Sequence, residues 1–306
     1  MNFTVINIVD KYTWRKDLKI LTSAETGVPQ LATFGYNMRT KAIRPLCLHC
    51  HKNKLEVLVV TSGRLCMAAG GKEYTVSGGE AFIAYPDEVH SSGEQNDTPQ
   101  KHYWFQINMQ NPQPFMGLDP KRGEALKAGL LAINKRIVKV DAGSVELLKK
   151  SFSLFSSGDE LDKIKACSLF VCFLTDFVKA ASRLPEEQCS PKIQLAADYI
   201  LENIENNICL EDVVAHCGMS LCGFKLKFAR EMGITPRNYI NLKKTEYAKQ
   251  KMKQDPDIKI TDLAIDLGFS SSNYFSVVFK KFAGMSPTEY AHGCALGDDV
   301  TAEKEN

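Results

Sequence analysis

The chain has no hydrophobic run long enough to cross a membrane. Its most apolar stretch, residues 168–178, has about eleven residues, whereas a transmembrane helix needs about 20. The N-terminal residues reach the charges of Asp10 and Lys11 without a long apolar core, so no secretory signal peptide is expected. These absences predict a cytoplasmic protein with no membrane partner.

The chain also has little net charge, +2 from 38 basic and 36 acidic residues, which excludes a strongly cationic protein. That small total conceals an uneven distribution. Between Lys225 and Lys259, ten lysine or arginine residues stand against four aspartate or glutamate residues. A local basic excess suits a surface that contacts nucleic-acid phosphates, although any single lysine here also fits a solvated helix face.

Ten cysteines are present, but without an export signal we expect reduced thiols rather than disulfides. Residues 47–51 formally match the C-x-x-C-H pattern of haem attachment. That chemistry requires export. Since Cys47 and Cys50 would point to opposite faces of a strand, a shared structural zinc ion is not expected either.

Residues 260–290 are the most informative stretch of the chain. An apolar helix face is followed by Gly268, which suits a positive-φ turn, and by serines that suit a helix N-cap. The i, i+3, i+4 and i+7 positions of the next helix form one core-facing stripe of Phe275, Val278, Phe279 and Phe282. Residues 286–289 then combine a proline at the first helical position with a capping box. The pattern predicts a helix-turn-helix motif.

The same pattern occurs earlier, in residues 210–239. Gly218 and Ser220 correspond to Gly268 and Ser270, about fifty residues later. After one inserted residue, the core, turn and cap residues continue to match, pairing Phe224, Phe228, Gly233, Pro236 and Tyr239 with Phe275, Phe279, Gly284, Pro287 and Tyr290. An internal duplication of this kind predicts two helix-turn-helix motifs.

The segment GFSSSNYFSVVFKKFAGMSPTEY closely resembles the signature of the AraC/XylS family of bacterial transcription regulators. The duplicated region, residues 190–292, corresponds to the whole DNA-binding domain of that family. The resemblance implies a regulator that binds a double-stranded DNA operator and responds to a small-molecule effector, most often a sugar or a related metabolite. It implies no enzymatic activity, and it makes RNA polymerase a partner if the output is activation.

The two recognition helices are expected to begin near Ser220 and Ser271. A helix over residues 236–252, about 25 Å long, would join the motifs and place both recognition helices in successive major-groove turns. The candidate base-reading residues are Cys222, Lys225, Leu226, Ser272, Asn273, Ser276 and Val277. The candidate phosphate contacts are Lys227, Arg230, Lys243, Lys280 and Lys281.

Leu226 and Val277 stand where the family pattern often has an arginine, at equivalent positions of the two recognition helices. One interpretation is that they touch thymine methyl groups, the apolar feature of the major groove. The other is that a local shift buries them.

The first part of the chain, residues 1–115, is predicted to form a cupin-like, effector-binding β-barrel. Strand-like runs cover residues 55–60 and 81–85, and turns are expected at Ser62–Gly63, at Gly70–Gly71 and at residues 77–79.

Helical periodicity then covers residues 121–137, 144–155 and 161–181. We assign residues 116–183 to a helical dimerisation segment, because its helices have more apolar surface than a linker needs. The alternative is that these helices cover the barrel. The predicted α+β multidomain chain is completed by a linker, a DNA-binding domain and a polar tail over residues 184–191, 192–292 and 293–306.

A histidine-rich pattern lies in the predicted barrel. His49 and His51 share one face of a strand, Glu56 follows after four residues, and Gly63 follows six further on. Together with His90 this resembles the cupin motif that binds a divalent metal. AraC-like sensor domains often keep such residues without a metal, so the resemblance favours an effector pocket with no cofactor. A divalent metal on the same four side chains is the alternative.

Tyr36 and Trp104 are candidate aromatic walls of that pocket, although ordinary core packing suits them equally well. Two other function classes remain open. One is a cupin enzyme in which the metal set is catalytic, and the other is a regulator that senses metal or oxidants through its thiols.

Overall fold

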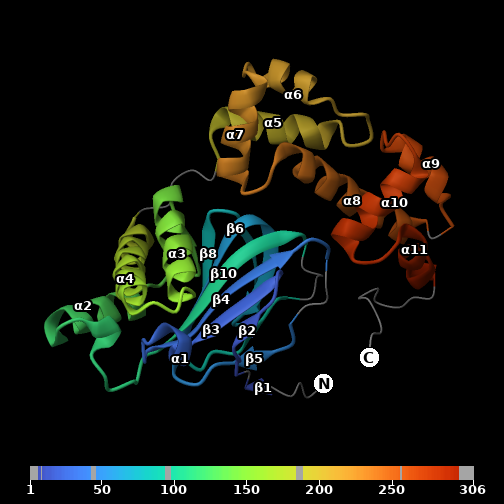
Figure 1. Cartoon of the computed structure of the whole chain (residues 1–306). Helices are drawn as coiled ribbons and strands as arrows, with labels where there is room; N and C mark the ends of the chain where they lie inside the picture. The colour runs from blue at the N-terminus through green and yellow to red at the C-terminus, as the bar shows by residue number, and fades with distance from the viewer. Residues whose placement is uncertain are drawn as a thin grey trace. The chain divides into compact units, whose positions relative to one another are not determined.

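The structure, a computed structural model, describes residues 6–7, 9–42, 46–93, 98–183, 189–255 and 257–295. The chain divides into two compact units, a sheet with helices α1–α4 and an all-helical unit of α5–α11 (Figure 1). Most of the predicted linker and polar tail, at residues 184–188 and 296–306, lies outside the described residues. In the described part of the chain, no helix is long and apolar enough to cross a membrane.

The first unit is built on a curled, mostly antiparallel sheet, for which the described residues supply eleven strands (Figure 1). The strands are β1 Ile6–Asn7, β2 Thr13–Trp14, β3 Leu18–Thr22, β4 Leu31–Arg39, β5 His49–Cys50, β6 Lys54–Ala69, β7 Lys72–Ser77, β8 Glu80–Ala84, β9 His90–Ser91, β10 Gln100–Asn108 and β11 Ile137–Lys139. The main path is β1-β5-β9-β6-β10-β4-β3-β2, and β7 and β8 also pair with β6. The long β6 pairs with β10 and β8 along its first half, and with β7 and β9 along its second. The sheet therefore folds over into the half-barrel of a cupin-like fold.

Gly63 does not form the turn that the sequence predicts. Gly63 has a φ of 84°, but β6 continues through it while the pairing with β10 shifts register nearby. The prediction of a turn at Ser62–Gly63 is therefore wrong, because a bulge lets one strand pass from one part of the sheet to the other. The turns predicted at Gly70–Gly71 and at residues 77–79 are confirmed, since they join β6 to β7 and β7 to β8.

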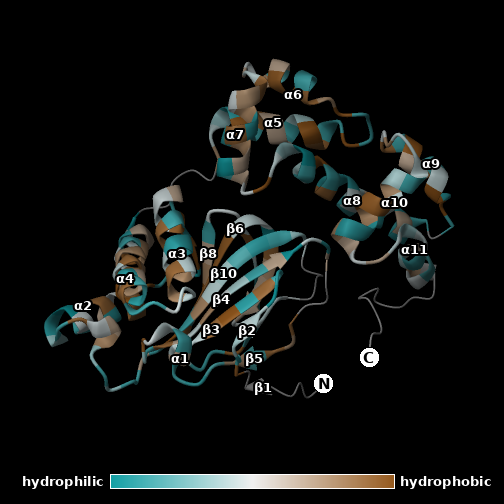
Figure 2. Ribbon diagram, viewed as in Figure 1, coloured by the Kyte–Doolittle hydropathy of each residue, from teal (hydrophilic) through white to brown (hydrophobic). Residues whose placement is uncertain are grey.

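Strand alternation divides the side chains of β6 between two environments. One face enters the core beneath the helices through Leu55, Val57 and Val59. The other face enters a second core inside the half-barrel through Leu58 and Val60, and Glu56 has the same parity as these two residues. Figure 2 shows the resulting mixture of hydrophobic and hydrophilic residues along the strands.

The helices of the first unit share their core with the sheet. They are α1 Ser23–Thr26, the 3-10 helix η1 Phe115–Gly117, α2 Pro120–Leu131, α3 Ala142–Phe155 and α4 Glu160–Ser182. The ring of Phe105 on β10 has its centroid 5.0 Å from that of Phe170 and 5.8 Å from that of Phe173, both on α4. Buried residues of α2 and α3 belong to the same core. These helices therefore cover the sheet, which is the alternative that the sequence left open.

The predicted helix over residues 121–137 is too long. α2 ends at Leu131, and Ile137 begins β11, which pairs antiparallel with β8. A strand edge has unpaired backbone N–H and C=O groups, and satisfying them outweighs a helical pattern that placed Ile133 and Ile137 on one face. Ile133 and Val138 still become buried in the core.

The second unit contains two helix-turn-helix motifs joined by α8. Its helices are α5 Pro191–Glu202, α6 Leu210–Cys217, α7 Leu221–Met232, α8 Pro236–Gln254, α9 Ile260–Asp266, α10 Ser272–Ala283 and α11 Pro287–Ala295. Ser220 and Ser271 cap the recognition helices α7 and α10, as predicted. The capping box of Ser286 and Glu289 is also present.

Each motif has its own hydrophobic core, and two helices enter both cores. α8 contributes Tyr239 and Ile240 to the first core, and Ala248 and Met252 to the second. α10 likewise divides its buried stripe, with Val278 and Phe282 in the first core and Phe275 and Phe279 in the second. The two motifs are therefore packed as one body rather than joined by a bare helix.

The motifs touch directly at Gly268 and Lys244. Gly268 has a φ of 65°, and a Cβ placed there would lie 2.6 Å from the Cα of Asn207, in the turn that precedes α6. The buried Lys244 ammonium donates hydrogen bonds to the carbonyl oxygen of Asn206, at 2.8 Å, and to that of Leu267. One side chain thus bonds the backbone of both motifs at the point where a glycine lets them meet.

Gly268→Ala is expected to destabilise the second unit more than Gly218→Ala. Both glycines have left-handed backbone, so each alanine adds about 1–2 kcal/mol of strain. At Gly218 the nearest neighbour of an added Cβ is Lys192 Nζ at 3.9 Å, whereas at Gly268 it is backbone of the other motif. Hydrogen exchange of the full chain in denaturant, measured on α9 and α10 peptides, gives the comparison. Equal losses of protection would contradict the backbone contact.

Candidate functional site

The recognition helices α7 and α10 bury one stripe and leave the rest of their surface accessible. Phe224 and Phe228 anchor α7, and Phe275 and Phe279 anchor α10. Of the predicted base-reading residues, Ser272 and Ser276 are half-buried, and the exposed members are Cys222, Lys225, Leu226, Asn273 and Val277. The structure thus places all of them where a ligand can reach them.

Leu226 and Val277 are 71% and 66% exposed. The local shift that would have buried them does not occur. Single exposed aliphatic residues are common on protein surfaces. Here, however, two of them occupy equivalent positions of duplicated helices, which fits an apolar contact made by both.

The predicted phosphate contacts on α7 lie beside an acidic residue. Lys227 Nζ is 3.8 Å and an Arg230 guanidinium nitrogen is 3.7 Å from Glu231 Oε1. Such partly exposed pairs contribute little to stability, so both cations can exchange the carboxylate for a phosphate. Lys280 on α10 is exposed.

The other two predicted phosphate contacts have closer partners. Lys243 forms an ion pair of 2.6 Å with Glu246, one turn further along α8. Lys281 donates a hydrogen bond of 3.4 Å to Asn238. Both residues are half-buried.

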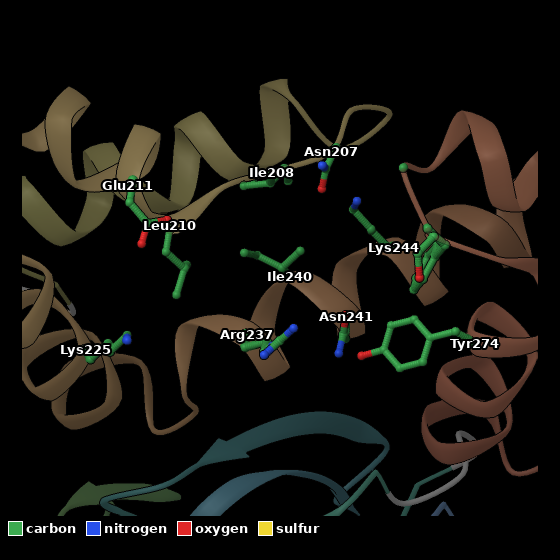
Figure 3. A pocket seen from close by; sticks show the side chains of 13 residues that line it. Asn207, Ile208, Leu210, Glu211, Lys225, Arg237, Ile240, Asn241, Lys244 and Tyr274 are labelled. Carbon is green, nitrogen blue, oxygen red and sulfur yellow. The ribbon is translucent and has the colours of Figure 1, made fainter.

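A pocket of about 710 Å³ lies between the two motifs (Figure 3). α7 borders it with Lys225 and α10 borders it with Tyr274. Its charged and polar lining includes Lys225, Glu211, Arg237, Asn241, Lys244 and Tyr274. The cations outnumber the single carboxylate among these residues, so the pocket is a positively charged concavity beside both recognition helices.

The sequence interpretation missed the α8 part of this pocket. Arg237, Asn241 and Lys244 fall at i, i+4 and i+7 of the linking helix. This spacing places them on one face, so the sequence could have predicted that they lie together. Lys243, which was selected instead, is not part of the lining. Burial lowers the pKa of Lys244 to about 8.

In the first unit, the residues of the cupin-like motif converge. His49 on β5 and His90 on β9 are direct partners in the pairing of those strands, His51 follows β5, and Glu56 lies on β6. Ligand nitrogens of the three histidines all lie within 4.8 Å of one another. The side chains are buried, since the four residues His49, His51, Glu56 and His90 are 4%, 3%, 8% and 1% exposed. We call these four residues the histidine cluster.

Backbone carbonyls orient two of the imidazole rings. His49 Nδ1 lies 2.8 Å from the carbonyl oxygen of Cys47, and His90 Nδ1 lies 2.9 Å from that of Glu88. Because a carbonyl oxygen only accepts, each Nδ1 carries a hydrogen. In the neutral ring, Nε2 is then the nitrogen that holds a lone pair.

Glu56 is the anion at the centre of the cluster. Its Oε2 is 3.0 Å from His51 Nε2, and its Oε1 is 3.6 Å from His90 Nε2. Burial acts to raise the pKa of Glu56, but its interactions with these histidines outweigh burial and hold the pKa well below its usual range. Burial lowers the pKa of His49, whereas the Glu56 carboxylate overcomes burial at His90 and raises its pKa.

The sequence interpretation missed two residues beside this site, Gln106, which contacts Glu56, and Asp10, which contacts Gln106. Gln106 Nε2 donates hydrogen bonds to Glu56 Oε2, at 2.9 Å, and to Asp10 Oδ2, at 3.1 Å. Burial, together with the charge of Glu56, raises the pKa of Asp10. Gln106 lies two residues after Trp104 on the same strand, so strand alternation alone predicts that both face the same side of the sheet. Nothing near Asp10 in the sequence links it to this site.

The two aromatic candidates lie on different faces of the sheet. Trp104 packs against Gly35, where a Cβ would lie 2.2 Å from the indole, and its Nε1 donates to Asp10 at 3.4 Å. Tyr36 instead packs in the core beneath the helices, with its ring centroid 4.9 Å from that of Tyr103. Trp104 therefore lies on the inner face of the sheet, where it shares Asp10 with Gln106, whereas Tyr36 lies on the opposite face.

Two family models match the chain. Residues 47–151 match an AraC-like ligand binding domain, and residues 213–293 match a helix-turn-helix domain, so together they span more than half of the chain. HTH-type transcriptional activator RhaS of Citrobacter koseri is 19% identical over 256 residues, which are 79% of this chain and 87% of that protein. The probable transcriptional regulator LumQ of Photobacterium leiognathi is 33% identical over 98 residues, which are 31% of this chain and 38% of that protein.

Among solved structures, ToxT from Vibrio cholerae is similar at 15% identity with a TM-score of 0.33, covering 85% of this chain and 99% of that one. At that score the similarity adds nothing to the family models. RhaS and LumQ are both named as transcription regulators. The chain belongs to the AraC family, as a DNA-binding transcription regulator that combines an effector-binding domain with a helix-turn-helix domain.

Proposed function

We propose that α7 and α10 enter successive major-groove turns of one operator, and that the intervening DNA backbone lies over the pocket between the motifs. The observation that carries this proposal is the position of the pocket, which has Lys225 of α7 at one side and Tyr274 of α10 at the other. DNA carries one negative charge per phosphate, so a positively charged concavity between two reading helices suits its backbone.

In this arrangement some residues contact base edges and others contact phosphates. The exposed positions of the two recognition helices read base edges, with Lys225 and Asn273 as polar readers. Arg230, Lys280 and, on the α8 face of the pocket, Arg237 contact phosphates and set the register of the protein on the duplex. The ion pair with Glu246 makes Lys243 a poorer phosphate contact than Arg237.

Arg237→Gln is expected to weaken binding to all operator sequences alike, because a phosphate contact carries no base information. It should also reduce the slope of log K against log salt by about 1. Lys243→Gln is the matched control, since it removes a cation of the same helix outside the pocket. Fluorescence anisotropy of the full chain over a salt series measures both slopes. Equal slopes for the two variants would place the DNA backbone elsewhere.

Leu226 and Val277 are proposed to touch thymine methyl groups. Val277→Ala should lower affinity by about 1 kcal/mol, and only for sites with thymine opposite it. Ile265→Ala is the control, because Ile265 is 70% exposed on α9. An operator in which uracil replaces that thymine lacks the methyl group. The affinity of wild type for this operator should be as low as the affinity of the Val277→Ala variant for the thymine operator. Equal affinity of wild type for thymine and uracil would refute the contact.

The effector is proposed to be a sugar or a related metabolite, the commonest class in the family, and Trp104 supplies an aromatic surface on the inner face of the sheet. A panel of sugars screened by thermal shift on the full chain tests this class. RhaS is named an activator. We extend that output to this chain, with RNA polymerase as the partner at the promoter.

The chain is further proposed to form a homodimer through α4. Leu161 and Ile164 are 76% and 64% exposed on this helix. Ser168 and Cys172 continue the same exposed stripe at helical spacing. Because α4 buries its opposite stripe in the core of its own unit, the exposed stripe is available to the same stripe of a second copy.

Replacing Leu161 and Ile164 together by lysine should convert the dimer to a monomer, because the lysines would bring four like charges into the interface. Leu131→Lys is the control, since Leu131 is an exposed apolar residue of α2 outside the stripe. Sedimentation velocity of the full chain at micromolar concentration measures the change. A monomeric wild type would overturn the proposal.

A further inference from the structure

Lys244 is a buried amine that the proposed operator contacts do not use. The residue is 5% exposed, and its Nζ donates hydrogen bonds to the carbonyl oxygen of Asn206, at 2.8 Å, and to that of Leu267. In the described part of the chain, no carboxylate forms an ion pair with it. A buried ammonium whose partners are neutral keeps its proton less firmly than one in water.

The protonation of Lys244 makes it a nucleophile near neutral pH. Burial lowers its pKa to about 8, so about one molecule in ten has a neutral amine at pH 7. A lysine with the ordinary pKa of about 10.4 is neutral in fewer than about one molecule in a thousand. Only the neutral amine has the lone pair that attacks an electrophile.

The hydrogen bonds of Lys244 leave that lone pair accessible. A neutral amine has two N–H groups, one for each of the two carbonyl oxygens. Nζ is tetrahedral, so Cε and the two hydrogen bonds occupy three of its four directions, and the lone pair occupies the fourth. Lys244 lines the pocket of about 710 Å³ between the motifs (Figure 3). A small molecule in the pocket can therefore approach the lone pair.

The other cations of the pocket indicate which electrophile fits. Arg237 stands two turns before Lys244 on the same face of α8, and Lys225 borders the pocket from α7. Guanidinium and ammonium groups both bind phosphate. An acyl phosphate has an electrophilic carbonyl carbon next to an anionic phosphate, so cations that hold its phosphate present its acyl carbon to the amine.

We propose that Lys244 is a modification site, at which an acyl phosphate transfers its acyl group to Nζ. The Nζ lone pair attacks the acyl carbon and a C–N bond forms. The C–O bond to phosphate breaks, inorganic phosphate leaves with the electron pair, and the proton lost from Nζ passes to water. The product is an uncharged N-acyl-lysine.

Acylation loosens the junction between the two motifs. The amide of N-acyl-lysine has one N–H group, so one of the two carbonyl oxygens loses its partner. The acyl group also needs space where a Cβ added to Gly268 would already lie 2.6 Å from the Cα of Asn207. A loosened junction lowers operator affinity because both recognition helices read one operator, and this last step rests on the proposed function.

The first test is the rate of acetylation at each lysine of the full chain in acetyl phosphate at pH 7, measured by peptide mass spectrometry. Lys244 should react at least about 10-fold faster than Lys243, because more of its amine is neutral. Lys243 is the matched control, a half-buried lysine of the same helix that pairs with Glu246 outside the pocket. The rate at Lys244 should rise with pH and level off above about pH 8. Equal rates at the two lysines would overturn the proposal.

The second test separates the phosphate contact from the reactivity of the amine. Arg237→Gln should slow the acetylation of Lys244 by acetyl phosphate several-fold, because the variant loses a cation that holds the phosphate. Acetic anhydride carries no phosphate, so its reaction with Lys244 should be unchanged in the variant. Equal rates for wild type and variant in acetyl phosphate, or equal slowing with both reagents, would contradict acyl phosphate as the donor.

The third test measures the junction itself. Acetylation should speed hydrogen exchange in α9 and in the turn before α6, and should lower operator affinity about 10-fold. Lys244→Arg is the control, because arginine keeps donors for both carbonyls and is not acetylated by acetyl phosphate. Both effects should be absent in this variant.

Unchanged exchange in acetylated wild type would overturn the effect on the junction. Faster exchange with unchanged operator affinity would support the modification and contradict instead the reading of one operator by both helices. If Lys244→Arg fails to fold, the reaction rates and the hydrogen exchange of wild type decide the proposal.

Discussion

The spacing of the two recognition helices depends on how α8 joins both motifs. Its apolar side chains enter two separate cores, and Lys244 donates hydrogen bonds to backbone carbonyls of both motifs. Gly268 lets their backbones touch. The DNA duplex has a fixed helical repeat of about 34 Å. A protein that reads two consecutive turns therefore needs a stiff junction of this kind, which fixes the spacing of its recognition helices. The basic pocket exists because the same junction holds the motifs together at one place and leaves a concavity beside it.

In the sensor unit, strand alternation imposes a different constraint. The residues of β6 that face the helices are aliphatic, so the intervening positions face the inside of the half-barrel, and Glu56 is one of them. A buried carboxylate is stable only with partners, which are supplied by two histidines and by Gln106. The inner face thereby gains a compact polar site within an otherwise apolar core.

The sequence interpretation was most accurate in the DNA-binding region. Caps, turns and buried stripes there involve residues within one or two helical turns of each other. Because the motif is duplicated, each assignment in one copy can be compared with the equivalent residue in the other. It was wrong where a distant strand intervened: β8 draws Ile137 into β11, and the pairing of β6 with several neighbours converts the expected turn at Gly63 into a bulge. Neither competing strand is visible in the local pattern.

The sequence by itself determined the family, the two helix-turn-helix motifs, the starts of α7 and α10, the approximate span of α8, and the set of histidines with Glu56. Local spacing specifies all of these. Only the tertiary structure decided that Arg237 and Lys244, rather than Lys243, line the pocket, that Gln106 links Asp10 to Glu56, and that Tyr36 packs beneath the helices. Each of these outcomes depends on which segments, far apart in the chain, pack together, because burial and hydrogen bonding across such contacts select one face of a helix or strand over the other.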